Sequence, residues 1–125
     1  SKETPSSEPI YKNLIDEIFV YLNDRISYAK EIGINNIIID PGIGFGKSRL
    51  DNFKIIENIE DFYGLCCPIM LGISRKRILG FPTSDIQLKD ALTLAYSYPL
   101  IEKKVDFLRV HNVKMHKTFI NSLPT

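Results

Sequence analysis

Three clusters of polar residues each follow a run of apolar residues, and their side chains are of types that bind polar or anionic ligands. Residues 40–48 start with the carboxylate of Asp40 and run through a glycine-rich loop to a Lys-Ser pair. Residues 72–77 hold a glycine, a hydroxyl and three consecutive cations, and the third cluster is Arg109 with His111. A carboxylate accepts hydrogen bonds from N–H donors, whereas cationic side chains favour phosphates. The clusters predict a ligand site, although each alone is also compatible with a solvated loop or a structural histidine.

The glycine-rich loop differs in length from two nucleotide-binding motifs. A P-loop, G-x-x-x-x-G-K-[ST], requires a glycine at position 41, where the chain has Pro41. The dinucleotide motif G-x-G-x-x-G fails as well, because the glycines alternate at positions 42, 44 and 46. A nucleotide-binding α/β protein is therefore the weaker alternative. A plain strand-to-helix turn leaves unexplained why a carboxylate stands at the end of a strand.

Alternating helices and strands are predicted to position these clusters. Residues 1–9 are predicted to be a loop or a frayed terminus. Apolar residues then recur every four positions from Ile10 to Ile26, which predicts a helix that packs on a sheet and ends at Gly33. Strands are predicted over residues 34–39, 68–73 and 107–110, the first with a fully buried run at 37–39.

Three further helices are predicted from residues that can cap them, namely Ser48, the run Thr83-Ser84-Asp85, and Asn112. Gly64 is expected to end the first of these, and Pro99 to kink or end the second. The residues expected on the inward face of the second are Leu88, Ala91, Leu92, Ala95 and Tyr96.

The order of the predicted elements implies a parallel sheet with right-handed crossovers. A doubly wound sheet and part of a (β/α)₈ barrel both satisfy this order. A complete barrel needs about 250 residues, whereas this chain has 125. In either fold the three polar clusters lie at the carboxyl ends of strands, which is where such folds bind ligands.

The composition argues against several classes of protein. A net charge of +1 gives no basic footprint for nucleic acid, and no apolar run approaches the roughly 20 residues of a membrane span. The chain starts at Ser1 without an apolar signal region. Cys66 and Cys67 are adjacent and lack metal-ligand spacing, so we expect two reduced thiols. We therefore expect a piece of a cytoplasmic protein that has neither a nucleic-acid nor a membrane partner.

Taken together, the three motifs resemble one family, dihydropteroate synthase. The motifs are Asp-Pro-Gly-Ile-Gly-Phe-Gly-Lys at 40–47, Gly-Ile-Ser-Arg-Lys at 72–76 and Arg-Val-His at 109–111. The resemblance implies that residues 10–125 are a partial pterin-binding domain, the C-terminal half of a (β/α)₈ TIM barrel with strands six to eight. It also implies a transferase of folate biosynthesis. Such an enzyme condenses p-aminobenzoate with 6-hydroxymethyl-7,8-dihydropterin diphosphate and releases pyrophosphate.

The resemblance also implies roles for individual residues. The pterin would be bound by Asp40, Gly72, Lys76 and Arg109. The aminobenzoate would contact Phe45 and Lys76, and the diphosphate would be held by Arg109 and His111. Mg²⁺ is implied for the complete enzyme, with its protein ligand in a strand that this chain lacks. The implied partners are the two small-molecule substrates, together with a second copy in a homodimer or a complementing N-terminal half.

Three positions depart from the family pattern. Arg77 stands where the family has Ser, Asn112 where it has Asp, and Lys104 where it has a helix-ending Gly. None of the three replaces a principal ligand residue. The alternative to a catalytic half is a non-catalytic remnant, or a half-enzyme that needs a partner chain. We expect residues 1–125 alone not to catalyse the reaction.

Overall fold

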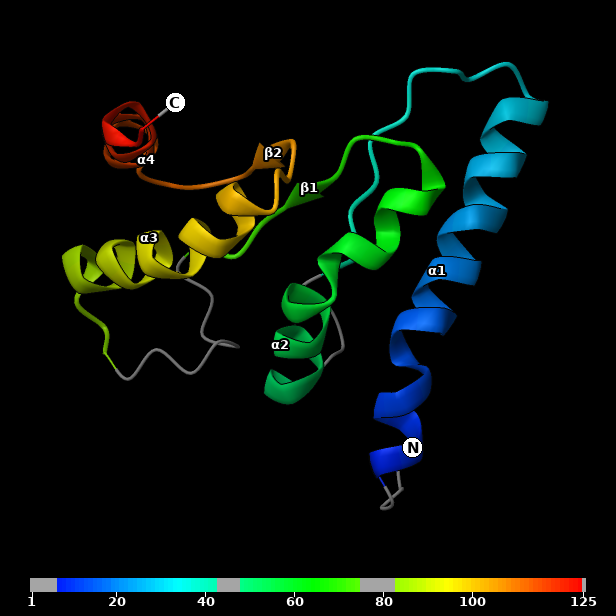
Figure 1. Ribbon diagram of the computed structural model, residues 1–125, viewed down its shortest axis with the longest axis horizontal. Helices are drawn as coiled ribbons and strands as arrows, with labels where there is room; N and C mark the ends of the chain where they lie inside the picture. The colour runs from blue at the N-terminus through cyan, green and yellow to red at the C-terminus, as the bar shows by residue number, and fades with distance from the viewer. Residues whose placement is uncertain (1–6, 43–47, 75–82, 125) are drawn as a thin grey trace.

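A short parallel sheet with helices packed along one of its faces makes up the computed structural model of the chain (Figure 1). The structure describes residues 7–42, 48–74 and 83–124. In chain order the elements are α1 (Ser7–Glu31), α2 (Arg49–Glu57), the 3₁₀ helix η1 (Ile59–Leu65), β1 (Met70–Leu71), α3 (Ile86–Glu102), β2 (Phe107–Leu108) and α4 (Val113–Ser122). Of the helices in the described ranges, none has the length and apolar content needed to cross a membrane.

The sheet joins three segments in parallel. β1 pairs with β2, with Met70 opposite Phe107. The first predicted strand is reduced to a single bridge between Ile39 and Ile69, in which the Ile39 N–H donates to the Pro68 carbonyl at 2.9 Å. The predicted strands therefore have the right location and direction but are too long. Among the described residues, only the central segment has hydrogen-bonded neighbours on both sides, so the outer segments have a ladder along one edge only.

One face of the sheet is covered and the other is open. Ile39, Ile69 and Leu71 are buried beneath the helices. Side chains alternate along a strand, and on the opposite face Ile38 is 54% exposed and Phe107 is 48% exposed. The prediction of a fully buried run at residues 37–39 is therefore wrong, because only one face of this segment is covered.

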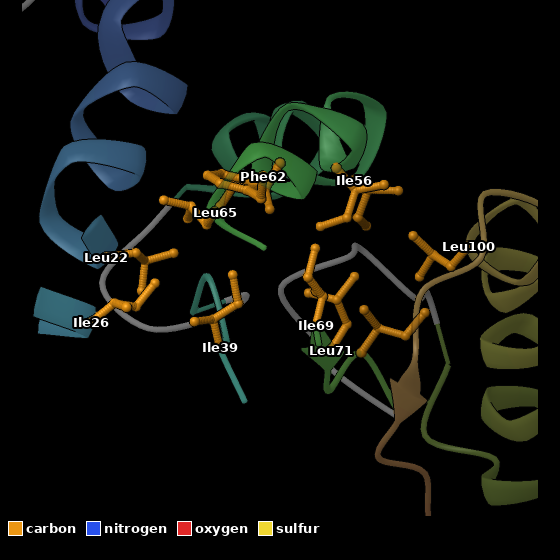
Figure 2. Packing of buried hydrophobic residues seen from close by; sticks show 12 residues of the cluster. Leu22, Ile26, Ile39, Ile56, Phe62, Leu65, Ile69, Leu71 and Leu100 are labelled. Carbon is orange, nitrogen blue, oxygen red and sulfur yellow. The ribbon is translucent and has the colours of Figure 1, made fainter. Parts of the chain in front are cut away.

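The core lies between the covered face of the sheet and the helices (Figure 2). In Figure 2, Ile39, Ile69 and Leu71 face Phe62, Leu65 and other residues of α2 and η1. The helices contribute to this core the apolar residues Leu22, Ile26, Ile55, Ile56, Ile59, Phe62, Leu65 and Leu100. Each fully buried side chain of this size contributes about 1.5–3 kcal/mol relative to an exposed one. The predicted apolar stripe of α1 is confirmed by Leu22 and Ile26.

Four predicted helix boundaries are confirmed by their backbone geometry. Gly33 has a φ of +94° after α1. The Ser48 hydroxyl accepts a hydrogen bond from the Asp51 N–H at 3.0 Å, which forms one half of a capping box. The side chains of Asp85 and Asn112 likewise accept N–H bonds at the starts of α3 and α4.

Two predicted boundaries are wrong, and of the two outcomes predicted for Pro99, a kink or an end of the helix, the end is wrong. α1 begins at Ser7 rather than at Ile10. The left-handed residue after η1 is Cys66, with a φ of 59°, and not Gly64. Pro99 does not end α3, which continues to Glu102. A proline removes one N–H donor from the helical ladder, and α3 tolerates that loss near its end.

The predicted inward face of α3 is wrong in part, since of its five residues only Leu92 and Tyr96 pack against the core. Leu88, Ala91 and Ala95 are exposed, whereas Leu92 and Tyr96 are partly buried. The buried residues of α3 are Asp90, Thr93, Ser97 and Leu100. The Thr93 hydroxyl donates to the Lys89 carbonyl at 2.8 Å and the Ser97 hydroxyl to the Thr93 carbonyl at 2.8 Å, so these polar groups are buried with partners.

Candidate functional site

Site residues from all three clusters lie at the carboxyl end of the sheet, where its parallel segments end. Asp40 directly follows Ile39, Gly72 directly follows β1, and Arg109 directly follows β2. The Arg109 N–H donates to the Leu71 carbonyl at 2.9 Å, which extends the pairing of β1 with β2 into the site. The prediction that these three residues meet at the carboxyl ends of the strands is therefore consistent with the fold.

Gly72 lies directly under the guanidinium of Arg109. A Cβ atom at position 72 would be 2.5 Å from Nη2 and 3.0 Å from Nε of Arg109. Such contacts are far too short, so any side chain at position 72 would displace the guanidinium. The family resemblance implied a contact between the pterin and Gly72. In this structure the group that approaches the backbone there is Arg109.

The Asp40 carboxylate is partly buried and is oriented by the turn that follows it. Its Oδ1 accepts a hydrogen bond from the Gly42 N–H at 2.9 Å. Gly42 has a φ of +83°, a conformation that glycine adopts without strain. An ionised carboxylate has about four lone-pair sites. One bond from the turn therefore leaves Asp40 with the capacity to accept N–H donors from a ligand.

His111 is held by Ser74 through two contacts. The His111 N–H donates to Ser74 Oγ at 3.0 Å, and the ring Nδ1 lies 2.8 Å from the same oxygen. Ser74 is only 6% exposed. Sequence reasoning counted the Ser74 hydroxyl among the polar groups of a ligand site but did not pair it with His111. The signal that could have found it is register, because Ser74 and His111 both lie three residues beyond the Leu71–Leu108 pair.

A buried polar network lies behind the site, between α3 and α4. The Asn112 side chain accepts from the Met115 N–H at 3.0 Å and donates to the Asp90 carboxylate at 3.3 Å. His116, 5% exposed, has its Nε2 3.0 Å from the Ser97 hydroxyl. An aspartate at position 112 could not donate to Asp90. The departure at Asn112 is therefore matched by a hydrogen bond that only the amide can make.

The remaining predicted site residues, Phe45 and Lys76, lie outside the described residues, as does Arg77. Within the described ranges, no group of three or more His, Cys, Asp or Glu side chains is arranged to hold a metal ion. Cys66 and Cys67 are free thiols, as predicted.

The arrangement can bind an elongated polar ligand. Asp40 lies on the first segment of the sheet and Arg109 on the third, so about two strand spacings, roughly 10 Å, separate their backbones. A carboxylate at one end suits N–H donors, and a guanidinium with an imidazole at the other end suits an anion. The two ends together fit a ligand with a hydrogen-bond-donating ring and an anionic tail.

Comparison with known proteins places the chain among enzymes of one kind. A model of the family described as "Pterin binding enzyme" matches residues 1–111. Dihydropteroate synthase from Clostridium beijerinckii is 40% identical over 107 residues, which cover 82% of this chain and 40% of that protein. The chain thus spans well under half the length of this relative.

Solved structures give the same picture. Dihydropteroate synthase from Anaplasma phagocytophilum, with bound 6-hydroxymethylpterin-monophosphate, superposes with a TM-score of 0.81 at 34% identity, over 89% of this chain and 44% of that one. The enzyme from Thermus thermophilus, in complex with 4-aminobenzoate, also has a TM-score of 0.81, at 27% identity, over 87% of this chain and 45% of that one. The predicted fold, part of a (β/α)₈ TIM barrel, is thereby confirmed.

Proposed function

We propose, because this chain belongs to the family of pterin-binding enzymes, that it forms the C-terminal half of the active site of a dihydropteroate synthase. The observation that carries this assignment is the meeting of Asp40, Gly72 and Arg109 at one sheet edge, on segments with the motifs of that family. Relatives of known structure bind a pterin monophosphate and 4-aminobenzoate, which supports the same two substrates here.

Asp40 anchors the pterin in this proposal. The amino group and a ring N–H of a pterin form a paired donor edge, and an ionised carboxylate accepts both bonds with the added strength of its charge. The turn bond from the Gly42 N–H holds the carboxylate in place before the ligand arrives. Arg109 lies two strand spacings away, where the other end of the pterin and its diphosphate would lie.

Arg109 and His111 bind the departing diphosphate. The amine nitrogen of p-aminobenzoate attacks the methylene carbon of the pterin, so that a C–N bond forms while the C–O bond to diphosphate breaks. The bonding electron pair leaves with pyrophosphate, and the amine proton goes to solvent. A guanidinium and an imidazole donor stabilise the negative charge that develops on the leaving group. We assign Phe45 and Lys76 to the aminobenzoate side, and Lys76 also to the pterin.

A complementing N-terminal half supplies the rest of the barrel in this proposal. The open face of the sheet carries the exposed side chains of Ile38 and Phe107. A closed barrel covers such a face with side chains from its other strands. A homodimer is the second form of association that the family implies.

Pyrophosphate inhibition tests the assignment. The enzyme is reconstituted from this chain and the part of the Clostridium beijerinckii relative that the chain does not match, and inhibition of turnover by pyrophosphate is measured. Arg109→Ala should weaken inhibition about tenfold or more, the size expected for one hydrogen bond to a charged group. Lys103→Ala, at the cap residue that follows α3, is the control and should leave inhibition unchanged. Equal inhibition of the Arg109→Ala variant and the parent would refute the role of Arg109.

A further inference from the structure

We propose that Ser74 is a positioning residue that fixes the neutral ring of His111 in the Nε2–H tautomer, so that the ring donates a hydrogen bond to an anionic oxygen. The role of the anion rests on the proposed function, whereas the tautomer of the ring does not. The sequence placed the Ser74 hydroxyl in a polar cluster without a specific partner. Here Ser74 would determine which ring nitrogen of His111 carries the proton, and it would not contact the ligand itself.

The hydrogen-bond inventory of Ser74 decides the tautomer. Its Oγ accepts the His111 N–H at 3.0 Å, and the ring Nδ1 of His111 lies 2.8 Å from the same Oγ. A hydroxyl has one proton to donate. Among the described residues, Ser74 has no other hydrogen-bond partner than these two nitrogens. Oγ could accept from both nitrogens only if its own proton found another acceptor, and the described residues offer none, so we assign the hydroxyl proton to Nδ1 and the ring proton to Nε2.

The burial of Ser74 strengthens its control over the tautomer of the His111 ring. Ser74 is 6% exposed, so water competes poorly for its hydroxyl. The His111 side chain is exposed, although its Nδ1 is held by the buried serine. Nε2 lies on the opposite side of the imidazole ring from Nδ1, so the contact with Ser74 leaves it available to a ligand. Arg109, two residues earlier, supplies the positive charge, so the ring can contribute a donor while it stays neutral.

The second histidine shows why Ser74 differs from an ordinary serine neighbour. His116 also faces a hydroxyl, with its Nε2 3.0 Å from Ser97 Oγ. However, the Ser97 hydroxyl has a competing acceptor in the Thr93 carbonyl at 2.8 Å, so its proton is not committed to the ring. The His116 Nδ1 lies 3.1 Å from the Asn112 carbonyl. His116 therefore serves as an internal reference with a different environment.

Nitrogen NMR reads the tautomer directly. The chain contains only two histidines, so a long-range ¹H–¹⁵N spectrum of the histidine-labelled 125-residue chain, bound to an unlabelled complementing half, shows two ring patterns. At alkaline pH, where imidazole is neutral, His111 should show a protonated Nε2 and an unprotonated Nδ1. A protonated Nδ1 in the unmodified chain would overturn the proposal without any variant.

Variants then separate positioning from folding. Ser74→Ala should convert the His111 pattern to a mixture of tautomers, and Ser74→Thr, which keeps the hydroxyl, should restore it. Ser97→Ala is the matched control and should change the His116 pattern only. The His116 signals report whether the Ser74 variants remain folded, and the His111 signals do so for Ser97→Ala. An unchanged His111 pattern in folded Ser74→Ala would show that the serine does not set the tautomer.

A titration with inorganic pyrophosphate tests the consequence for the anion. Pyrophosphate should shift the His111 Nε2 signal, and Ser74→Ala should weaken its binding about 2- to 12-fold, the range for one ordinary hydrogen bond. Equal binding by Ser74→Ala and the parent would overturn the positioning role. An Nε2–H ring that pyrophosphate leaves unperturbed would instead refute the anion site of the proposed function, while the effect of Ser74 on the tautomer would stand.

Discussion

Gly72 and Arg109 show how the absence of a side chain can position another residue. The guanidinium lies where a Cβ at position 72 would be, 2.5 Å from Nη2. The absence of a Cβ at position 72 therefore leaves room for this position of the guanidinium, and no positive φ calls for a glycine there. The place of Gly72 in the motif could be predicted from the sequence, but this reason could not, because it depends on the register between β1 and β2.

Gly72→Ala should weaken pyrophosphate binding because the new methyl group displaces the guanidinium. We expect a loss of about 1.5 kcal/mol or more, the value for a hydrogen bond to a charged group. Gly64→Ala is the matched control, since a Cβ there would meet Phe19 at an ordinary 3.7 Å. Calorimetric titration of both variants checks the expectation. Equal pyrophosphate binding by the two variants would show that the missing side chain at position 72 does not determine where the Arg109 guanidinium lies.

Asp40→Ala should weaken pterin binding by about 1.5–3 kcal/mol, because the pterin loses a charged acceptor. Fluorescence titration of the reconstituted enzyme with a pterin monophosphate measures the change. Asp51→Ala, in the capping box of α2, is a control for loss of a carboxylate near the same loop. Unchanged pterin affinity in Asp40→Ala would remove Asp40 from the site.

At the scale of elements, the order of helices and strands could be predicted from apolar periodicity and cap residues. The buried face of α3 could not. Counting apolar residues selects Leu88 and Ala91, yet the face that packs holds Asp90 and Ser97. These polar side chains are stabilised by partners on other elements, such as His116, which periodicity along one helix cannot reveal.

The end of α3 is strained at Lys104, which has a φ of +66°. A residue with a Cβ pays roughly 1–2 kcal/mol for this conformation, whereas glycine adopts it freely at a smaller entropic cost. Lys104→Gly should therefore raise the free energy of unfolding by about 0.5–1 kcal/mol. Lys103→Gly should lower the free energy of unfolding for two reasons. Lys103 has an ordinary φ of −82°, so a glycine relieves no strain there, and its Nζ donates to the Glu57 carbonyl at 2.9 Å. Urea denaturation compares the two, and the reverse order would contradict this account.

Tyr63 makes the link between η1 and the end of α3 sensitive to alkali. Its hydroxyl donates to the Lys103 carbonyl. Burial, and then the negative charges of Glu60 and Asp106, raise the pKa of Tyr63 above its usual value of 10.0. A raised pKa in the folded state means that the neutral form is favoured by folding. This contribution to stability is fully present below about pH 10 and is lost as the pH rises above it.

Tyr63→Phe should therefore lose less stability than the parent between about pH 9 and pH 11. Thermal unfolding followed by circular dichroism at each pH measures the difference. Tyr21, in α1, is 64% exposed. Tyr21→Phe is therefore the matched control and should follow the parent curve. Parallel curves for Tyr63→Phe and the parent would show that Tyr63 makes no such contribution.

At the scale of the whole molecule, the sheet is a barrel segment with one face and two edges uncovered. Within the described residues, Ile39 and β2 each pair with the central segment only. Unpaired edges can join other chains, and the open face exposes Ile38 and Phe107. The chain alone should therefore associate or aggregate, and light scattering should fall when a complementing half is added. A stable monomer with and without that half would contradict this reading.

Turnover on mixing two halves shows whether this chain forms the C-terminal half of the active site of a dihydropteroate synthase. This chain and the unmatched part of the Clostridium beijerinckii relative are assayed separately and together, with p-aminobenzoate, the dihydropterin diphosphate and magnesium. An absent set of ligand-contacting residues costs orders of magnitude in rate. We therefore predict dihydropteroate formation by the mixture and none above background by either half alone. Turnover by this chain alone at the rate of a complete enzyme, or no turnover by two halves that demonstrably bind each other, would contradict the account.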